Sequence, residues 1–294
     1  MRTGLPSNSG GKSTHTSRFK LPTGMTNACS RAHSRSDSPQ YVTNLGLAAD
    51  LRCLITLNKT AYAFGKFEHL LSERATFTLV RELAADCEEF VDVGANEGAF
   101  TFLVHNDHPR VRLHWFEPDR QIARRLGINL TKNNIVAFGN EMAVAERTGK
   151  ATFFKNLSDD FSGSLSGLFT QKHITRAETV ETISLAEYFR AQKIGGALVK
   201  VDVEGAGEKV WDGAEAASKS IRYLVMEMLT PEIGAGLPAR IITETDLKVP
   251  SLDGTFEYPA PFWNWLFCRI AEGTPSPSYH RLALTSYKGK RQQS

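Results

Sequence analysis

Phe90-Val91-Asp92-Val93-Gly94-Ala95-Asn96-Glu97-Gly98-Ala99-Phe100 is the most informative segment of this sequence. An apolar run ends in Asp92, turns through Gly94 and Gly98, and leads into a second apolar-periodic segment. Glycine lets backbone approach a ligand closely, and the start of the next helix presents N–H groups that lack an intrahelical partner. The pattern therefore predicts a buried strand that ends at a nucleotide-like ligand. The alternative is a turn whose glycines serve only tight packing.

A second apolar run, residues 111–116, ends in Glu117, about 25 residues after Asp92. In an open α/β unit, an acid at this point accepts the hydroxyl groups of a ribose. The alternative is a solvated residue in a turn before a helix that starts at Pro118. The glycine order is not the G-x-G-x-x-G of dinucleotide sites, so it favours a nucleoside without a pyrophosphate. S-adenosylmethionine is the common ligand that carries an adenosine and no phosphate.

Two further apolar runs also carry acids at their ends. Residues 197–203 lead into Asp202 and Glu204, and residues 221–228 include Glu227. Because ligands of open α/β sheets bind at the carboxyl ends of the strands, we expect these acids to line one site. Asp202 and Glu204 are predicted to face the acceptor, the molecule that receives a methyl group from such a cofactor. A carboxylate there removes a proton from the acceptor or orients it. The alternative is that they cap the helix that begins near Ala206.

Alternating patterns predict an α/β fold with a mostly parallel, doubly wound sheet and helices on both faces. An aromatic run at 262–268 is the expected antiparallel last strand. A polar loop at 159–166 lies between two extra strands, at the ligand edge where substrate choice is usually encoded. The expected strands are 89–93, 111–116, 134–138, 150–155, 178–183, 197–203 and 221–228, and the expected helices are 66–86, 97–106, 119–132, 184–193 and 206–217, with a lid or connector at 230–238.

Composition indicates a soluble globular protein, with 41% hydrophobic and 23% charged residues in a chain of 294. No run reaches the 18 or so apolar residues of a membrane span, and the four cysteines form no C-x-x-C pair. A cytoplasmic protein without a metal site is therefore predicted. Residues 1–40 hold six Lys/Arg against the single acid Asp37 and are expected to be disordered. This segment also resembles an organelle transit peptide, so organelle import is an alternative.

The remainder of the chain has 29 basic and 31 acidic residues, and it lacks the basic footprint of a nucleic-acid binder. Four segments are predicted: an extension over 1–40, a helical lead-in over 41–88, the ligand-binding domain over 89–270 and a tail over 271–294. The oligomeric state is not indicated by any sequence pattern.

Residues 88–230 resemble the FkbM-type S-adenosylmethionine-dependent methyltransferases. The matching blocks are Asp92-Val93-Gly94-Ala95-Asn96-Glu97-Gly98, Phe116-Glu117-Pro118, Asn129 with Asn133, Ala143-Val144, Ile183-Ser184-Leu185, Lys200-Val201-Asp202-Val203-Glu204-Gly205-Ala206, Gly213-Ala214-Glu215 and Val225-Met226-Glu227. The lysine-led block is the most specific to the family. One position departs from it: Gly207 stands where the family usually has an acidic residue.

The resemblance implies a Rossmann-like methyltransferase fold, S-adenosylmethionine as the cofactor, and O-methylation of a sugar, glycolipid, polysaccharide or secondary metabolite. With the argument from the strand ends, it assigns cofactor binding to Asp92, Gly94, Ala95, Asn96, Gly98, Glu117, Pro118 and Ala143, and the catalytic acceptor side to Asp202 and Glu204. The alternatives are a cofactor-binding scaffold without catalysis, at which Gly207 hints, and a nicotinamide-dependent oxidoreductase, which the glycine order disfavours.

Overall fold

Strand β1 (Glu89–Val93) is a five-residue strand with every residue buried, and it pairs in parallel with a strand on each side. Its partners are β2 (Arg112–Phe116) and β8 (Ala197–Val201). The structure is a computed structural model and describes residues 74–158, 162–171, 173–249 and 262–269. The predictions for 1–40 and 271–294 lie outside these ranges, as do the part of the lead-in before residue 74 and residues 159–161 of the predicted loop. None of the helices within them combines the length and apolar character that crossing a lipid bilayer requires.

The main sheet has six strands in the order β10-β9-β8-β1-β2-β3. The outer strands are β3 (Phe138–Asn140), β9 (Ile221–Leu229) and β10 (Phe262–Cys268). Only β10 runs antiparallel to its neighbour; the other pairings in this sheet are parallel. This order confirms the predicted fold class, including the antiparallel last strand.

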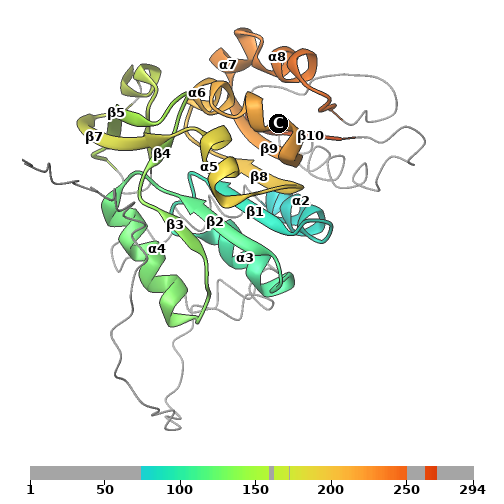
Figure 1. Cartoon of the computed structure of the whole chain (residues 1–294). Helices are drawn as coiled ribbons and strands as arrows, with labels where there is room; N and C mark the ends of the chain where they lie inside the picture. Colours follow the sequence, from blue (N-terminus) through green and yellow to red (C-terminus); the bar gives the residue numbers. More distant parts are fainter. Residues whose placement is uncertain (1–73, 159–161, 172, 250–261, 270–294) are drawn as a thin grey trace, which may run out of the picture. The chain divides into compact units, whose positions relative to one another are not determined.

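Helices cover both faces of this sheet (Figure 1). On one face, the alternate residues Phe90, Leu113 and Leu198 pack against three helices. On the other face, Val91 and Val199 pack against three different helices. This division follows from the two-residue period of a strand, which sends successive side chains to opposite faces. The first face carries α2 (Arg74–Ala84), α3 (Ala99–Asp107) and α4 (Arg120–Lys132), and the second carries α5 (Leu185–Gln192), α6 (Gly207–Asp212) and α8 (Leu237–Glu244).

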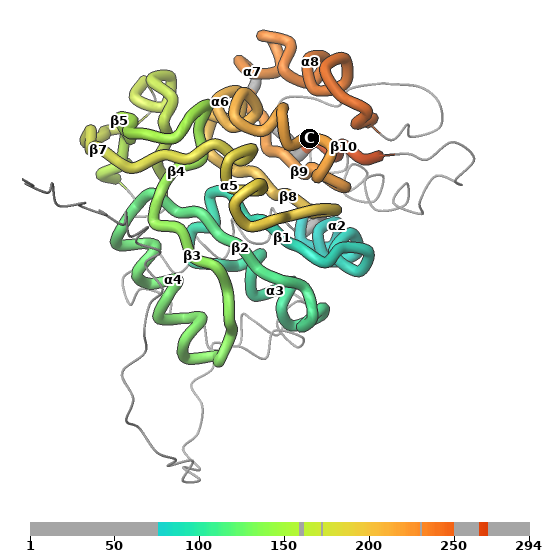
Figure 2. The backbone as a smooth tube through the Cα atoms, in the orientation of Figure 1, coloured from blue at the N-terminus to red at the C-terminus, as the bar shows by residue number. Residues whose placement is uncertain are grey.

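The chain changes direction across the sheet beside β1. It runs outward from β1 through β2 to β3, passes through a second sheet, and returns to β8 on the other side of β1 (Figure 2). A ligand of an open α/β sheet binds at such a reversal, outside the carboxyl ends of the strands. We refer to the ends of β1, β2, β8 and β9 together as the carboxyl edge.

The second sheet has the strand order β4-β7-β5-β6 and is anchored on both sides of β1. The Lys155 ammonium pairs with Asp119 Oδ2 at 2.6 Å, just after β2, and Ser164 Oγ donates to the carbonyl oxygen of Val203 at 3.0 Å, just after β8. The second sheet therefore borders the carboxyl edge. Its presence confirms the prediction of extra strands. Its members are β4 (Ala143–Val144), β5 (Gly149–Asn156), β6 (Gly163–Ser164) and β7 (Thr175–Ile183).

Several predicted boundaries were wrong. The expected strand 134–138 is β3 at Phe138–Asn140 instead, because the end of α4 is closed by hydrogen bonds from Asn134 N to Thr131 O and from Ile135 N to Leu130 O. The expected helix 206–217 stops at Asp212, and a 3₁₀ helix, η3 (Glu215–Ser220), follows.

The expected lid or connector at 230–238 consists of α7 (Thr230–Gly234) and the first residues of α8. The expected strand 197–203 ends at Val201.

Gly213 offers a test of how the second sheet packs on the core. A Cβ at Gly213 would lie 2.1 Å from the carbonyl oxygen of Ala145, so Gly213→Ala should destabilise the protein by about 1–3 kcal/mol. Gly127 lies inside α4 with no atom within 4 Å of its Cβ position, so Gly127→Ala should stabilise it by about 0.5–1 kcal/mol. Urea unfolding of both variants measures this. A Gly213→Ala variant as stable as the wild type would contradict the described packing.

Candidate functional site

The loop after β1 is held between the ends of the two neighbouring strands. The N–H groups of Gly94 and Ala95 both donate to the carbonyl oxygen of Phe116, each at 3.0 Å. Gly94 has φ of 77°, and a Cβ there would lie 1.8 Å from the carbonyl oxygen of Asp202. Gly98, with φ of 92°, precedes α3, and its Cβ would lie 2.3 Å from Leu126 Cδ1. Both glycines therefore have a packing reason that is independent of any ligand.

The Glu117 carboxylate lies against this loop and is only 6% exposed. Its Oε2 accepts a hydrogen bond from the Asn96 N–H at 3.0 Å, and its Oε1 accepts one from the Asp119 N–H at 2.9 Å. Burial raises the pKa of Glu117 to about 7, although the two backbone hydrogen bonds lower it. Because a carboxylate oxygen has two acceptor positions, each oxygen retains capacity for a further donor.

Asp92 is fully buried, and its two oxygens have different surroundings. Oδ2 accepts a hydrogen bond from Thr101 Oγ1 at 2.8 Å, whereas Oδ1 has no hydrogen-bond partner within the described ranges. Burial raises the pKa of Asp92, and the nearby Lys200 opposes that rise. Since buried polar atoms in native proteins are nearly always paired, Asp92 Oδ1 marks a place for a donor from water or a ligand.

Asp202 follows β8, and its side chain is 19% exposed. Its N–H donates to the carbonyl oxygen of Val93 at 3.0 Å, which fixes its position beside the end of β1. Its Oδ2 accepts a hydrogen bond from Lys200 Nζ at 3.0 Å. Sequence reasoning gave no role to Lys200, although a lysine in the otherwise apolar strand Ala197–Val201 was the available signal.

The predicted site residues do not all lie together. Asp92, Gly94, Glu117 and Asp202 meet at the carboxyl edge through the contacts described above. Glu204 has φ of 52° and lies beyond the end of β8, so strand alternation does not extend to it.

Two more predicted cofactor residues lie at the borders of this edge. Ala143 is a buried residue of β4, where it pairs with β7. Pro118 is half-buried, between Glu117 and the Asp119 cap of α4.

Gly207 departs from the family pattern, and the carboxylate of a residue distant in the sequence, Glu232, lies beside it. Its N–H donates to Glu232 Oε1 at 2.6 Å, and the Leu229 N–H donates to Glu232 Oε2 at 2.9 Å. A Cβ at Gly207 would lie 2.8 Å from Glu232 Oε1, so a side chain at this position would press on that carboxylate. Glu232, which sequence reasoning missed, thus caps α6, and Gly207 has a structural explanation that does not involve loss of catalysis.

A chain of buried and half-buried polar groups supports the backbone of Glu117. The Glu117 N–H donates to the carbonyl oxygen of Asn140 at 3.1 Å, and Asn140 Nδ2 donates to Trp115 O at 3.0 Å and to the Tyr188 hydroxyl oxygen at 3.2 Å. His114 lies between Tyr188 and Glu89, at 2.9 Å from each. Burial lowers the pKa of His114 and raises that of Tyr188 to about 12, so both stay neutral near pH 7.

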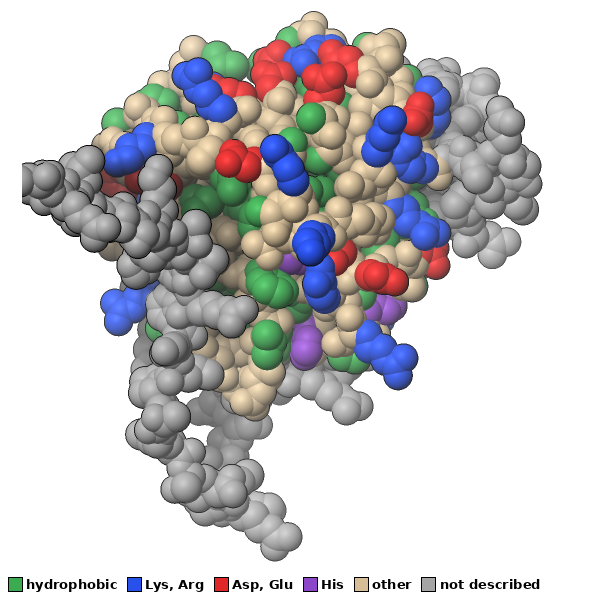
Figure 3. All heavy atoms as spheres, viewed as in Figure 1, with side chains coloured by type: hydrophobic (Ala, Val, Ile, Leu, Met, Phe, Trp, Pro, Cys, Tyr) green, Lys and Arg blue, Asp and Glu red, His purple; other side chains and the backbone are tan. Residues whose placement is uncertain are grey.

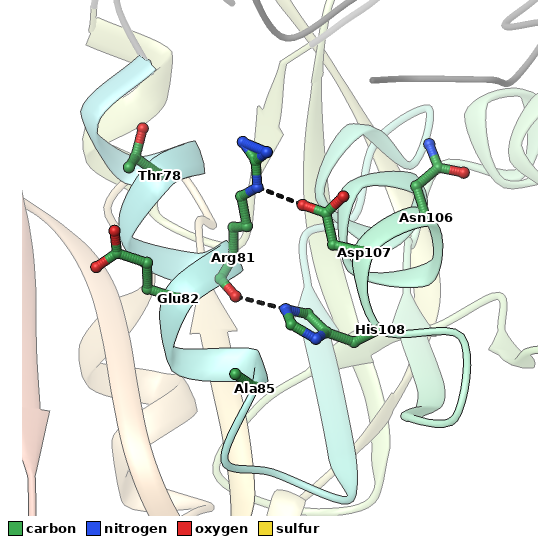
Figure 4. Close-up of a pocket in the computed structure, with 7 residues that line it drawn as sticks. All are labelled: Thr78, Arg81, Glu82, Ala85, Asn106, Asp107 and His108. Carbon is green, nitrogen blue, oxygen red and sulfur yellow. Dashed lines mark hydrogen bonds and ion pairs between the residues drawn. The ribbon is translucent and has the colours of Figure 1, made fainter.

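A pocket between α2 and α3 lies away from this site (Figure 4). Arg81 of α2 forms an ion pair with Asp107 there, and the His108 ring contacts the carbonyl oxygen of Arg81 at 2.8 Å. Both helices end at this pocket and lead into the amino ends of β1 and β2. The pocket therefore lies at the edge opposite the clustered acids, and it contributes nothing to their chemistry.

Comparison with known proteins matches residues 92–246 to the model of the methyltransferase FkbM domain. The 31-O-demethyl-FK506 methyltransferase FkbM of Streptomyces tacrolimicus is 27% identical over 165 residues, which are 47% of this chain and 64% of that protein. The match thus spans less than two thirds of the relative's length.

Two solved structures are similar at low identity. The methyltransferase FkbM of Methylobacillus flagellatus KT is 15% identical, with a TM-score of 0.36 over 78% of this chain and 58% of that one. An O-methyltransferase family protein of Burkholderia thailandensis is 13% identical, with a TM-score of 0.37 over 79% and 69%. The fold assignment therefore rests on the strand order of the sheet itself.

The raised pKa of Glu117 predicts a pH-dependent stability. A carboxyl group whose pKa is higher in the folded state than in the unfolded state stabilises folding at low pH, and this contribution is lost as pH rises towards the folded value of about 7. The stability of the wild type relative to Glu117→Gln should therefore fall between pH 4.5 and 7, by at most about 1.4 kcal/mol per pH unit. Urea unfolding across this range measures the difference. A constant difference would show that Glu117 is ordinarily solvated.

Proposed function

Because the chain belongs to the FkbM methyltransferase family, we propose that it is a methyltransferase that transfers the methyl group of S-adenosylmethionine to a hydroxyl group of a sugar, glycolipid, polysaccharide or secondary metabolite. The observation that carries this proposal is the buried Glu117 carboxylate. It lies against the loop after β1, and its two oxygens are oriented by backbone N–H groups. These oxygens suit the two hydroxyls of a ribose.

The other groups at the edge fit the same cofactor. Asp92 Oδ1 lacks a hydrogen-bond partner among the described residues and suits an ammonium donor. The glycine-bearing loop brings backbone to the edge without side chains at positions 94 and 98. The edge also carries more acids than bases, because Asp92, Glu117 and Asp202 lie there with Lys200. A net negative site attracts a positively charged sulfonium.

When bound, the cofactor supplies a methyl group on a sulfonium, which is open to in-line displacement. The chain's own task is then mainly alignment and exclusion of water. We assign the ribose to Glu117, the methionine portion to the loop 94–98, and the acceptor side to Asp202 and Glu204. The hydroxyl of the acceptor donates its hydrogen bond, or its proton, to a carboxylate on that side.

We further propose that the acceptor is not a nucleic acid. The chain after residue 40 has a slight excess of acids over bases, and Figure 3 shows acidic and basic side chains interspersed over the visible face. Tight nucleic-acid binding uses a basic patch or stripe instead. The second sheet, anchored beside the edge through Lys155 and Ser164, is the element that we expect to select the acceptor.

Replacement of Glu117 tests the cofactor assignment. Glu117→Ala removes the acceptors of the ribose hydroxyls, and hydrogen bonds to a charged group contribute about 1.5–3 kcal/mol each, so affinity for S-adenosylmethionine should fall well over tenfold. Isothermal titration calorimetry measures it. Glu178→Gln, an exposed carboxylate on β7, is the matched control and should bind as the wild type does. Unchanged affinity in Glu117→Ala would remove the ribose assignment.

A transfer assay tests the reaction itself. With methyl-labelled S-adenosylmethionine and a panel of glycans and hydroxylated natural products, we expect label in an acceptor as a methyl ether, which survives mild alkali, whereas a methyl ester does not. Cofactor binding without transfer to any acceptor would favour the scaffold alternative. Binding of NADH, detected by its fluorescence, in place of S-adenosylmethionine would favour an oxidoreductase.

A further inference from the structure

Lys200 is a charged side chain in the otherwise apolar strand β8. It is 2% exposed, and its neighbours along β8 are all buried apolar residues. Its Nζ lies 4.4 Å from the centroid of the Phe100 ring, on the face of the sheet that α3 covers. An ammonium buried to this extent is stable in its charged form only where carboxylates or aromatic faces compensate the loss of water.

Two carboxylates compensate this ammonium. Asp202 Oδ2 accepts its hydrogen bond at 3.0 Å. Asp92 is its register partner on β1, so the two side chains leave the sheet on the same face, and the charge of Lys200 acts on Asp92. Two more acids belong to this edge. Glu117 follows β2, and its charge and that of Asp92 repel each other; Glu227 lies on β9, next to β8. The facing residues of α3, Phe100 and Thr101, are uncharged.

We propose that Lys200 is a positioning residue: its buried ammonium serves as the counter-ion of Asp92 and holds the Asp202 carboxylate in place at the carboxyl edge. A charge-assisted hydrogen bond from a buried ammonium fixes the carboxylate that accepts it. Lys200 therefore makes Asp202 a fixed hydrogen-bond acceptor that orients a bound group. Only the identity of that group rests on the proposed function.

The first test needs no cofactor. Lys200→Met keeps the length of the side chain and removes its charge, which leaves Asp92 buried without a counter-ion. The variant should then lose stability relative to the wild type as pH rises from 6 to 9, by up to tenfold in the unfolding equilibrium constant per pH unit. Lys150→Met is the matched control, because Lys150 pairs with Glu181 at the exposed surface; its difference from the wild type should not change with pH.

The double variant Lys200→Met/Asp92→Asn removes the ammonium together with the buried carboxylate. From pH 6 to pH 9, its stability should again change with pH as the stability of the wild type does. A Lys200→Met variant whose stability already changes with pH as that of the wild type does would overturn the proposal. If Lys200→Met fails to fold, folding of the double variant supports charge compensation, and failure of both contradicts it.

The second test asks whether Lys200 acts through Asp202. Methyl transfer from S-adenosylmethionine to an acceptor found in the transfer assay is measured for the wild type, Lys200→Met, Asp202→Asn and the double variant of these two, and binding of S-adenosylhomocysteine is measured separately by calorimetry. We expect each single change to lower the rate of transfer about tenfold or more, and the double variant to be as slow as Asp202→Asn. Losses of rate that multiply in the double variant would overturn the proposal. Absence of binding to the wild type would instead contradict the proposed function, and the stability test would still decide the role of Lys200.

Discussion

The close approach of three strand ends is the constraint on which the rest of the site depends. The loop after β1 donates two N–H groups to Phe116 O, and Val93 O accepts the N–H of Asp202, so the ends of β2, β1 and β8 are tied together. Only glycine fits at position 94, because any β-carbon would overlap the backbone of Asp202. With the ends fixed in this way, Glu117 and Asp202 come to lie on either side of the same loop.

This arrangement buries carboxyl groups, although burial disfavours their charged form. Glu117 and Asp92 are both buried carboxyl groups with raised pKa, and backbone N–H groups, Thr101 and Lys200 offset the loss of water only in part. Buried groups with perturbed pKa gather at functional sites more often than elsewhere. The ion pair that the second sheet makes just after β2 is neutral overall, since the Lys155 ammonium is paired with the Asp119 carboxylate. The uncompensated negative charge therefore stays at the edge, where a cationic ligand is favoured.

Much of this was predictable from the sequence, because apolar periodicity and the position of acids after strands are local signals. They placed β1, β2, β8 and β9 and brought Asp92, Glu117 and Asp202 to one edge. What sequence reasoning missed depends on contacts between distant segments. Glu232 caps a helix that begins 25 positions before it in the chain, and the carbonyl oxygen of Ala145 lies 2.1 Å from where a β-carbon at Gly213, just after α6, would be. The shift of β3 to Phe138–Asn140 has a local cause instead, the hydrogen bonds that close the end of α4.

The site as described requires that a nucleoside lies across the carboxyl edge, held by the loop after β1 and by Glu117. A crystal structure with S-adenosylhomocysteine would locate that nucleoside. We expect both ribose hydroxyls within hydrogen-bond distance of Glu117, the amino group near Asp92 Oδ1, and the sulfur facing the side of Asp202. A ribose bound elsewhere, with Glu117 bonded only to the N–H groups of Asn96 and Asp119, would contradict it.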